Sequence, residues 1–269
     1  MQTLLKVENL CKRYVKRSFT GAHEELLALD GVSFTILPGT TLAVVGESGS
    51  GKSTLALCVA ALEYPTSGNI WFEARDIVKF AENERRKLRP QIQLVFQDPA
   101  NSLNTRWNTF EILLEPLVLQ GKLNREEMKQ RAFFLLERVG LSSETLRRPP
   151  SELSGGQRQR LAIARALALD PKLLILDEAL SALDCSVQAQ IANLLMELQN
   201  SFGMTYLFVT HDLAMAAHLA DEIAVMHRGR IVERGPVEKV LRQPAHETTR
   251  QLLAAVPRMP RATPSVQEK

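Results

Sequence analysis

The sequence feature that most constrains the fold is a glycine-rich octapeptide set between an apolar run and a run of small aliphatic residues. Residues 46–53 read Gly-Glu-Ser-Gly-Ser-Gly-Lys-Ser and match the pattern G-x-x-x-x-G-K-[ST]. Thr40–Val45 before them is typical of a buried strand, and Ser53–Leu62 after them is typical of a helix. Glycines allow backbone N–H groups to converge on phosphate oxygens at the N-terminus of such a helix. This order predicts a phosphate-binding loop, and a chance glycine-rich turn is the weaker alternative.

Downstream of this loop, strand patterns alternate with helical patterns. Such alternation favours a mostly parallel sheet covered by helices. The segment Thr109–Val139 has leucines and charged residues at helical spacing, which indicates an inserted helical subdomain. Leu4–Val7 and Val32–Ile36 predict an opening rich in strands, and the turn signal Pro65–Gly68 should end the helix after the loop. The later strands are expected at Ile92–Phe96, Leu173–Leu176, Thr205–Val209 and Glu222–His227, and the later helices at Gln157–Leu169, Ser186–Phe202 and Leu213–Ala220.

The composition is typical of a globular chain and argues against several classes of function. With 269 residues, 45% of them hydrophobic, the chain can bury a substantial core. Its net charge of +3 is spread among scattered basic and acidic residues, so nucleic acid binding is not indicated. Its three cysteines form no C-x-x-C pair, so neither a disulfide framework nor a thiolate metal site is expected. Its apolar runs are shorter than the roughly 18–20 residues that span a bilayer, so a membrane role would require a partner.

Two adjacent acids follow a buried strand pattern. Leu173–Leu176 is followed by Asp177 and Glu178, and ligands of open α/β proteins bind at the carboxyl edge of the sheet. With Lys52 offering a positive charge to phosphate and Ser53 a hydroxyl to the metal, Asp177 is placed to hold Mg²⁺. Glu178 can activate the water that attacks a γ-phosphate. A solvated acidic turn is the alternative for these acids alone, and the phosphate loop favours the catalytic interpretation.

A second glycine-rich helix start, Leu153-Ser154-Gly155-Gly156-Gln157, offers another backbone cradle for an anion. One triphosphate does not need two cradles within one chain. This pentapeptide is the signature of the ATP-binding-cassette (ABC) family, and the chain closely resembles that family's nucleotide-binding domain from Leu4 to Gly235. The likeness also rests, in the family's order, on Gln97, Asp177-Glu178, Ser181-Ala182-Leu183-Asp184 and His211.

The resemblance implies an α/β fold: a P-loop NTPase cassette with a mostly parallel core sheet, an N-terminal antiparallel β subdomain and an inserted α-helical subdomain at about residues 98–165. It also implies a head-to-tail dimer, in which the signature of one subunit closes over ATP held on the phosphate loop of the other. Residues 1–235 would form the nucleotide-binding domain and residues 236–269 a C-terminal extension. The tail after Pro257 is expected to be disordered.

The resemblance also implies that the chain binds ATP and Mg²⁺ and hydrolyses ATP. Glu178 would be the catalytic base, His211 would steady the γ-phosphate and the attacking water, and Gln97 would sense the metal. Tyr14 would stack on adenine, with an ordinary surface tyrosine as the alternative. Magnesium would be held by Ser53, Gln97 and Asp177. The residues expected to contact nucleotide are Tyr14, Gly46, Glu47, Ser48, Gly49, Ser50, Gly51, Lys52, Ser53, Thr54, Ser154, Gly155, Gly156, Gln157 and Asp184.

Further segments resemble the branch of the family that energises uptake of oligopeptides, dipeptides and nickel. They are Phe96–Pro99, Asn101–Arg106, Glu115–Leu117 and, as a partial match, Thr249–Pro257. The chain is thus expected to be the ATPase subunit of an importer. A soluble ABC ATPase of DNA repair or translation is one alternative, against which the single cassette without a long coiled coil or basic tract argues. The energiser of an exporter is the other, and exporters more often have fused membrane helices.

The same resemblance implies several partners and a location. The partners are integral membrane permease subunits, a second ABC ATPase subunit and, indirectly, an extracytoplasmic solute-binding protein. A heterodimer of ATPase subunits is expected, with a homodimer as the alternative, and a short permease helix should fit a groove around Gln97 and the helical subdomain. The chain would lie peripherally on the cytoplasmic face of the inner membrane.

Two departures from the family pattern carry expectations of their own. Ala179-Leu180 stands where many members have Pro-Thr, which is expected to alter the stiffness of the loop and leave hydrolysis intact. No cysteine follows Cys185, so the iron–sulfur cluster found in the tail of some members is not expected.

Overall fold

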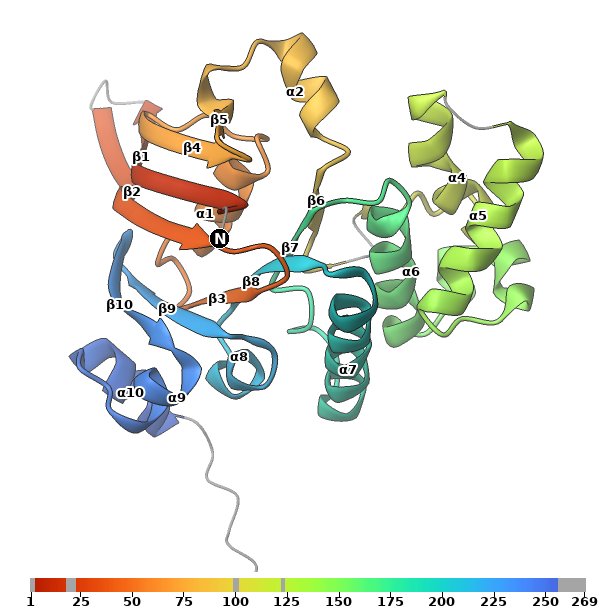
Figure 1. The fold of residues 1–269 in the computed structure, drawn as a ribbon. Helices are drawn as coiled ribbons and strands as arrows, with labels where there is room; N and C mark the ends of the chain where they lie inside the picture. The colour runs from red at the N-terminus through yellow and green to blue at the C-terminus, as the bar shows by residue number, and fades with distance from the viewer. Residues whose placement is uncertain (1–2, 18–22, 99–101, 122–123, 256–269) are drawn as a thin grey trace, which may run out of the picture.

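The computed structural model describes residues 3–17, 23–98, 102–121 and 124–255, in which two β-sheets are combined with helices (Figure 1). The first sheet is antiparallel with the strand order β2-β1-β4-β5, and the second has the order β10-β9-β3-β8-β7-β6. Strands β9, β3, β8, β7 and β6 run parallel, and β10 pairs with β9 antiparallel. The predicted α/β cassette, with a parallel core sheet and an antiparallel N-terminal sheet, is confirmed.

The elements have the following bounds. The first sheet contains β1 (Leu5–Arg17), β2 (His23–Ile36), β4 (Ser67–Phe72) and β5 (Arg75–Asp76). The second contains β3 (Thr41–Val45), β6 (Ile92–Val95), β7 (Leu173–Asp177), β8 (Thr205–Thr210), β9 (Glu222–His227) and β10 (Arg230–Pro236). The α-helices are α1 (Lys52–Val59), α2 (Glu82–Leu88), α4 (Thr109–Gln120), α5 (Arg125–Arg138), α6 (Gly155–Leu167), α7 (Cys185–Phe202), α8 (Leu213–Leu219), α9 (Val237–Arg242) and α10 (Glu247–Ala255).

The central strands are buried on both faces. Every residue of β3, β7 and β8 is buried, which explains why these strands read as continuous apolar runs in the sequence. Successive side chains point to opposite faces of the sheet. Ala43 and Val45 join the apolar cluster that contains α6, α7 and α8, whereas Leu42 and Val44 join the cluster that contains α1 and the antiparallel sheet.

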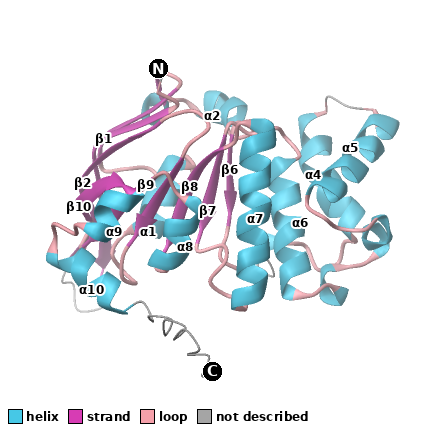
Figure 2. Ribbon diagram, turned by 60° about the horizontal axis from the view of Figure 1, so that its bottom comes forward, coloured by secondary structure: helices cyan, strands magenta, loops and turns pink. Residues whose placement is uncertain are grey.

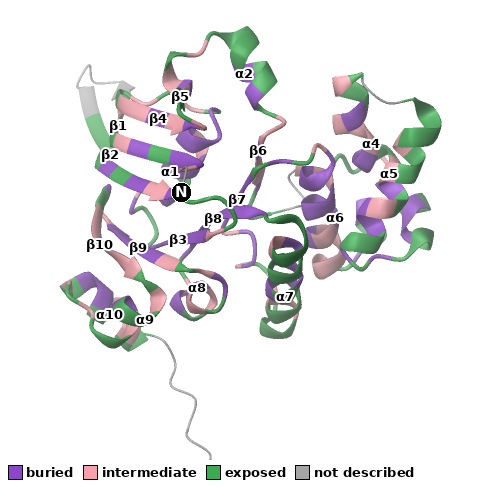
Figure 3. Cartoon of the chain, viewed as in Figure 1, coloured by how far each residue is buried: buried purple, intermediate pink, exposed green. Residues whose placement is uncertain are grey.

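The helices are arranged so that one edge of the parallel sheet stays accessible. Helices α6, α7 and α8 lie along one face of this sheet, and α4 and α5 stand beyond α6, against which they pack (Figure 2). Buried residues follow the strands and the inner faces of these helices (Figure 3). The carboxyl ends of β3, β6, β7 and β8 meet at the common edge where most of the expected catalytic residues follow the strands.

Four segments predicted from the sequence have boundaries that differ clearly from those of the structure. The segments expected at Leu4–Val7 and Val32–Ile36 are parts of the much longer strands β1 and β2. The helix after the phosphate loop ends at Val59 and not at Leu62, because Ala61 adopts a left-handed backbone with φ of 54°. The expected turn at Pro65–Gly68 is half strand, since β4 begins at Ser67.

Gly68 explains why β4 resembles a turn in the sequence. Its φ is 92°, and a Cβ atom there would lie 2.4 Å from the carbonyl oxygen of Asn9. A close approach between β1 and β4 therefore requires glycine inside a strand, where glycine is usually unfavourable.

A carboxylate on β10 holds the start of α10 through three hydrogen bonds. Glu233 accepts hydrogen bonds from the backbone N–H groups of Ala245 at 2.8 Å and His246 at 2.9 Å, and from Thr249 Oγ1 at 2.5 Å. Partial burial works to raise the pKa of Glu233, but these hydrogen bonds outweigh it and the net pKa is lowered. The carboxylate thereby caps the start of α10.

The predicted disordered tail after Pro257 lies outside the described residues.

We expect Glu233→Gln to loosen α10 by about 1–3 kcal/mol, because an amide is a weaker acceptor than a carboxylate. The measurement is hydrogen exchange of the α10 amides at neutral pH, which should become faster while exchange in β3 stays unchanged. Because the folded pKa is below the unfolded one, the contribution is complete above about pH 5 and is lost as the pH falls through the folded pKa. Unchanged α10 exchange would contradict this role.

Candidate nucleotide-binding site

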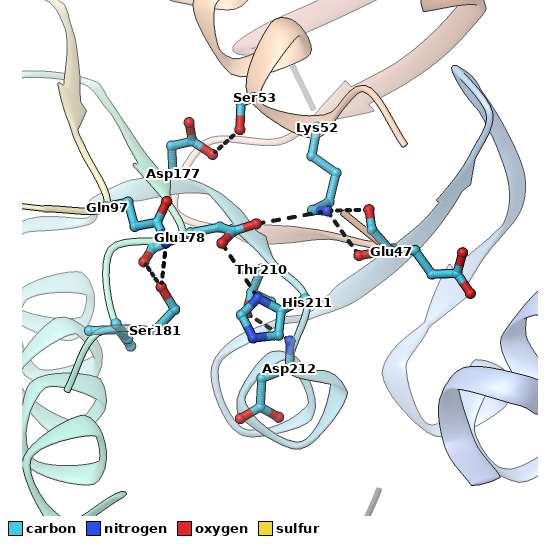
Figure 4. A network of polar contacts seen from close by, with 12 residues as sticks. Glu47, Lys52, Ser53, Gln97, Asp177, Glu178, Ser181, Thr210, His211 and Asp212 are labelled. Atoms are coloured by element: carbon cyan, nitrogen blue, oxygen red, sulfur yellow. Dashed lines mark hydrogen bonds and ion pairs between the residues drawn. The ribbon is translucent and has the colours of Figure 1, made fainter. Parts of the chain in front are cut away.

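The phosphate loop wraps around the ammonium group of Lys52. Lys52 Nζ donates hydrogen bonds to the carbonyl oxygens of Gly46 and Glu47, both at 2.8 Å (Figure 4). The side chain is 3% exposed, and burial lowers the pKa of Lys52, against the opposing effect of the carboxylates of Glu178 and Asp177. The loop thus concentrates positive charge and backbone donors at the N-terminus of α1, which suits a phosphate group.

Two glycines of the loop are required by close backbone contacts. A Cβ atom on Gly46 would lie 2.2 Å from the carbonyl oxygen of Met226, and one on Gly51 would lie 2.3 Å from that of Ala28. Gly51 also has a φ of 106°, which disfavours any other residue. The loop is therefore held between β9 and β2 with no space for a side chain at these positions.

The remaining expected loop residues are distributed around this cradle. Ser48, Gly49, Ser53 and Thr54 line a cleft of about 590 Å³ together with Lys52. Ser50 is buried: its N–H donates to the carbonyl of Glu47 at 3.2 Å, and its own carbonyl accepts from Gly229 at 2.9 Å.

Asp177 meets the start of α1 across the edge of the sheet. The hydroxyl of Ser53 donates to Asp177 Oδ1 at 3.1 Å (Figure 4). Burial raises the pKa of Asp177 and nearby Glu178 adds to this effect, whereas the Ser53 hydrogen bond and Lys52 oppose it. A hydroxyl and a carboxylate side by side supply the hard oxygen donors that Mg²⁺ prefers, so these residues fit that ion.

Glu178 lies between the lysine and a histidine. One carboxylate oxygen is 3.9 Å from Lys52 Nζ and the other is 3.4 Å from His211 Nδ1 (Figure 4). Glu178 has a φ of 48°, a left-handed conformation that costs a non-glycine residue about 1–3 kcal/mol and recurs at functional sites. His211 follows directly after β8, so the residues after β7 and β8 bring both side chains to one place.

Gln97, which follows β6, is connected to Glu178 through Ser181. Its Nε2 donates to Ser181 Oγ at 3.3 Å, and that hydroxyl donates to the carbonyl oxygen of Glu178 at 2.8 Å (Figure 4). Sequence reasoning quoted Ser181 within a motif and did not assign it to the site. Ala179 and Leu180, which depart from the family pattern, are 1% and 3% exposed and anchor the loop in the core.

Tyr14 lines the same cleft as Lys52, Gln97 and Glu178. Its strand is irregular at this point, with bulges between Leu10 and Arg13, and such bulges redirect side chains. Beside it, Lys12 Nζ lies 4.8 Å from the Tyr14 ring centroid and forms a 2.6 Å ion pair with Glu63. Tyr14 thus lines the cleft from β1, next to a lysine that contacts the segment after α1.

The signature residues lie elsewhere. Ser154 and Gln157 form a capping box at the N-terminus of α6, with hydrogen bonds of 2.9 and 3.2 Å. The residues that line the cleft include none of the four positions 154–157, and Figure 1 shows the start of α6 apart from α1. Gly156 approaches α7, where a Cβ atom would lie 2.7 Å from Val187 Cγ1. Asp184 caps α7 through the N–H of Val187 at 2.9 Å.

Comparison with known proteins decides the family. The family described as ABC transporter matches residues 29–181 of this chain. The chain belongs to the ABC transporter family. It is therefore a cassette ATPase that binds ATP, as the sequence predicted. No described helix is long and apolar enough to cross a membrane.

Two relatives and one solved structure illustrate the similarity. The dipeptide transport ATP-binding protein DppF of Escherichia coli K12 is 45% identical over 259 residues, which is 96% of this chain and 78% of that protein. The di/tripeptide transport ATP-binding protein DppF of Pseudomonas aeruginosa UCBPP-PA14 is 45% identical, with 96% of this chain and 80% of that protein covered. The dimeric post-hydrolysis state of the ATP-binding cassette MJ0796, bound to ADP and Pi, has a TM-score of 0.77 and 31% identity over 87% of this cassette and 98% of that chain.

The close contact between Gly46 and Met226 predicts that adding a methyl group at position 46 strongly destabilises the fold. We expect Gly46→Ala to destabilise the cassette by about 2–4 kcal/mol, because the backbone must separate from β9. Gly49→Ala is the matched control: its Cβ would meet no atom within 4 Å, and its φ of 79° alone should cost about 1–2 kcal/mol. Urea unfolding without nucleotide measures both, and equal costs would contradict the packing argument.

Proposed function

We propose that this cassette hydrolyses Mg·ATP to drive an importer of small peptides. The observation that supports the chemistry best is the convergence of Lys52, Ser53, Asp177 and Glu178 at one edge of the sheet. The substrate class is inferred from relatives of 45% identity whose names specify dipeptide and di/tripeptide transport. Nickel is the alternative substrate, because the sequence segments noted above resemble a branch that serves peptide and nickel uptake alike.

In the proposed reaction, the loop N–H groups and Lys52 bind the phosphates and offset their charge. Ser53 and Asp177 would hold Mg²⁺, with Gln97 nearby, and this ion supplies Lewis-acid stabilisation of the charge on the γ-phosphate. Glu178 accepts a proton from the attacking water, whose oxygen bonds to the γ-phosphorus as the bond to the ADP oxygen breaks. His211, 3.4 Å from Glu178, orients the carboxylate and the water.

The proposed site is completed by a second subunit. Ser154, Gly155, Gly156 and Gln157 lie outside the cleft of their own chain, so they would serve the nucleotide bound by a partner, with Asp184 at the interface. This arrangement explains why the chain carries two anion cradles. A heterodimer with a different ATPase subunit is our proposal, and a homodimer is the alternative.

A hollow of about 530 Å³ between β6, α4 and α6 is the proposed contact with the membrane subunits. Its lining includes Phe96 and Leu119, which are 42% and 78% exposed, and the basic side chains of Arg86 and Arg89. An amphipathic helix of a permease would cover these apolar side chains. The cassette would thereby lie peripherally on the cytoplasmic face of the inner membrane. An extracytoplasmic binding protein would be an indirect partner, and nucleic acid would not be a partner.

We propose the following division of the chain. Residues 1–235 form the cassette, with the helical insertion at about 98–165 carrying α4, α5 and part of α6. Residues 236–269 form the extension whose described part, α9 and α10, packs on β9 and β10.

We expect Glu178→Gln to lower ATP hydrolysis at least about 100-fold while ATP remains bound, because the amide cannot accept the proton. The trapped nucleotide should stabilise the dimer. Glu197→Gln, at an exposed position on α7, is the matched control and should leave turnover unchanged. Phosphate release and size-exclusion chromatography with ATP measure both effects. Near-normal turnover would remove Glu178 from its proposed role.

The experiment that tests the transport function is co-purification. The chain is expressed with its neighbouring genes and captured from detergent-solubilised membranes, and its companions are identified by mass spectrometry. Permease subunits and a second cassette are the expected result. Ribosomes or DNA-repair factors in their place would contradict the importer and leave the ATPase assignment intact.

A further inference from the structure

The two-residue turn between β9 and β10 has an arginine at a position with a left-handed backbone conformation. His227 pairs with Arg230, so Arg228 and Gly229 form the turn, with φ values of 46° and 79°. Positive φ at both positions defines the type I′ turn, for which Asn-Gly is strongly preferred. Gly229 meets this requirement. Arg228 does not, because its Cβ atom disfavours the left-handed region and it lacks the short polar side chain with which asparagine offsets that cost.

The conformation of this turn is enforced by its neighbours. The N–H of Gly229 donates to the carbonyl of Ser50 in the phosphate loop at 2.9 Å, and the carbonyl of Gly229 accepts from the N–H of Asp30 at 2.9 Å. A Cβ atom on Gly229 would lie 3.0 Å from the carbonyl oxygen of Ala28. The turn is therefore attached to both the phosphate loop and β2, and Arg228 cannot relax.

Arg228 lines the candidate nucleotide cleft together with Tyr14 and Leu27. Within the described ranges no carboxylate lies at ion-pair distance from it, whereas Arg230 in the same hairpin pairs with Asp30 at 2.6 Å. The segment of β2 against which the turn packs is also the one that pairs with Tyr14. Arg228 thus lies at the end of the cleft that contains the tyrosine and carries a guanidinium available to a ligand.

We propose that Arg228 is a nucleotide-binding residue that contacts the base and ribose of ATP. This inference rests on the proposed function, in which the cleft holds ATP. A planar guanidinium stacks on aromatic rings and donates hydrogen bonds to ring nitrogens and hydroxyls. Such contact accounts for an arginine where the backbone favours asparagine, since natural proteins retain local strain at functional sites.

The test is Arg228→Asn, for which stability and function change in opposite directions. Asparagine suits the type I′ turn, so the melting temperature of the full chain without nucleotide should rise by about 2–4 °C. The Kd for ATP, measured by calorimetry, should increase at least about fivefold. The Kd for tripolyphosphate, which has no base or ribose, should change less than about twofold.

Ala74→Gly is the matched control. Glu73 and Ala74 form the β4–β5 turn with φ values of 48° and 62°, and neither residue lines the nucleotide cleft. Relief of strain there should raise the melting temperature and leave the Kd for ATP unchanged.

Unchanged ATP affinity in Arg228→Asn, or an equal loss of tripolyphosphate affinity, would overturn the proposal, because Arg228 would then be inert or act as a distant charge only. Failure of the wild-type chain to bind ATP would overturn the proposed function itself.

Discussion

The site depends on one buried positive charge. An ammonium group loses hydration when it is buried, and this loss must be offset by nearby oxygen atoms. Here two loop carbonyls bind Lys52 at 2.8 Å, and Glu178 lies 3.9 Å away. Because these oxygens come from the loop after β3 and the residue after β7, the lysine ties together strands that are distant in sequence.

The surrounding backbone keeps this arrangement in place. Gly46 and Gly51 approach the carbonyls of β9 and β2 so closely that no side chain fits. The β9–β10 turn bonds to the loop through Ser50. The anion cradle is therefore part of the interface between the two sheets, and contacts with both sheets fix its shape. In contrast, the signature at α6 is built by local capping and belongs to a different surface of the cassette.

Local patterns explain what could be predicted from the sequence. The phosphate loop, the acids after β7 and the parallel sheet were recognisable because a buried strand and the residues at its end are contiguous in sequence. The strand β4 was missed because Gly68 serves a close approach to β1 that only the folded chain reveals. Ser181 and Arg228 were missed for a related reason. Ser181 belongs to the site through its contact with Gln97, and Arg228 through the fixed β9–β10 turn. Neither contact leaves a recognisable pattern in the local sequence.

The most direct test of the central claim is equilibrium binding of ATP with magnesium to the wild-type chain, to Lys52→Ala and to Lys87→Ala, whose substituted lysine is exposed on α2. The account predicts that Lys52→Ala weakens ATP binding at least about tenfold, through loss of the charge at the centre of the loop, while Lys87→Ala binds as the wild type does. Affinity within about twofold of the wild type in Lys52→Ala would contradict the assignment of this loop as the nucleotide site.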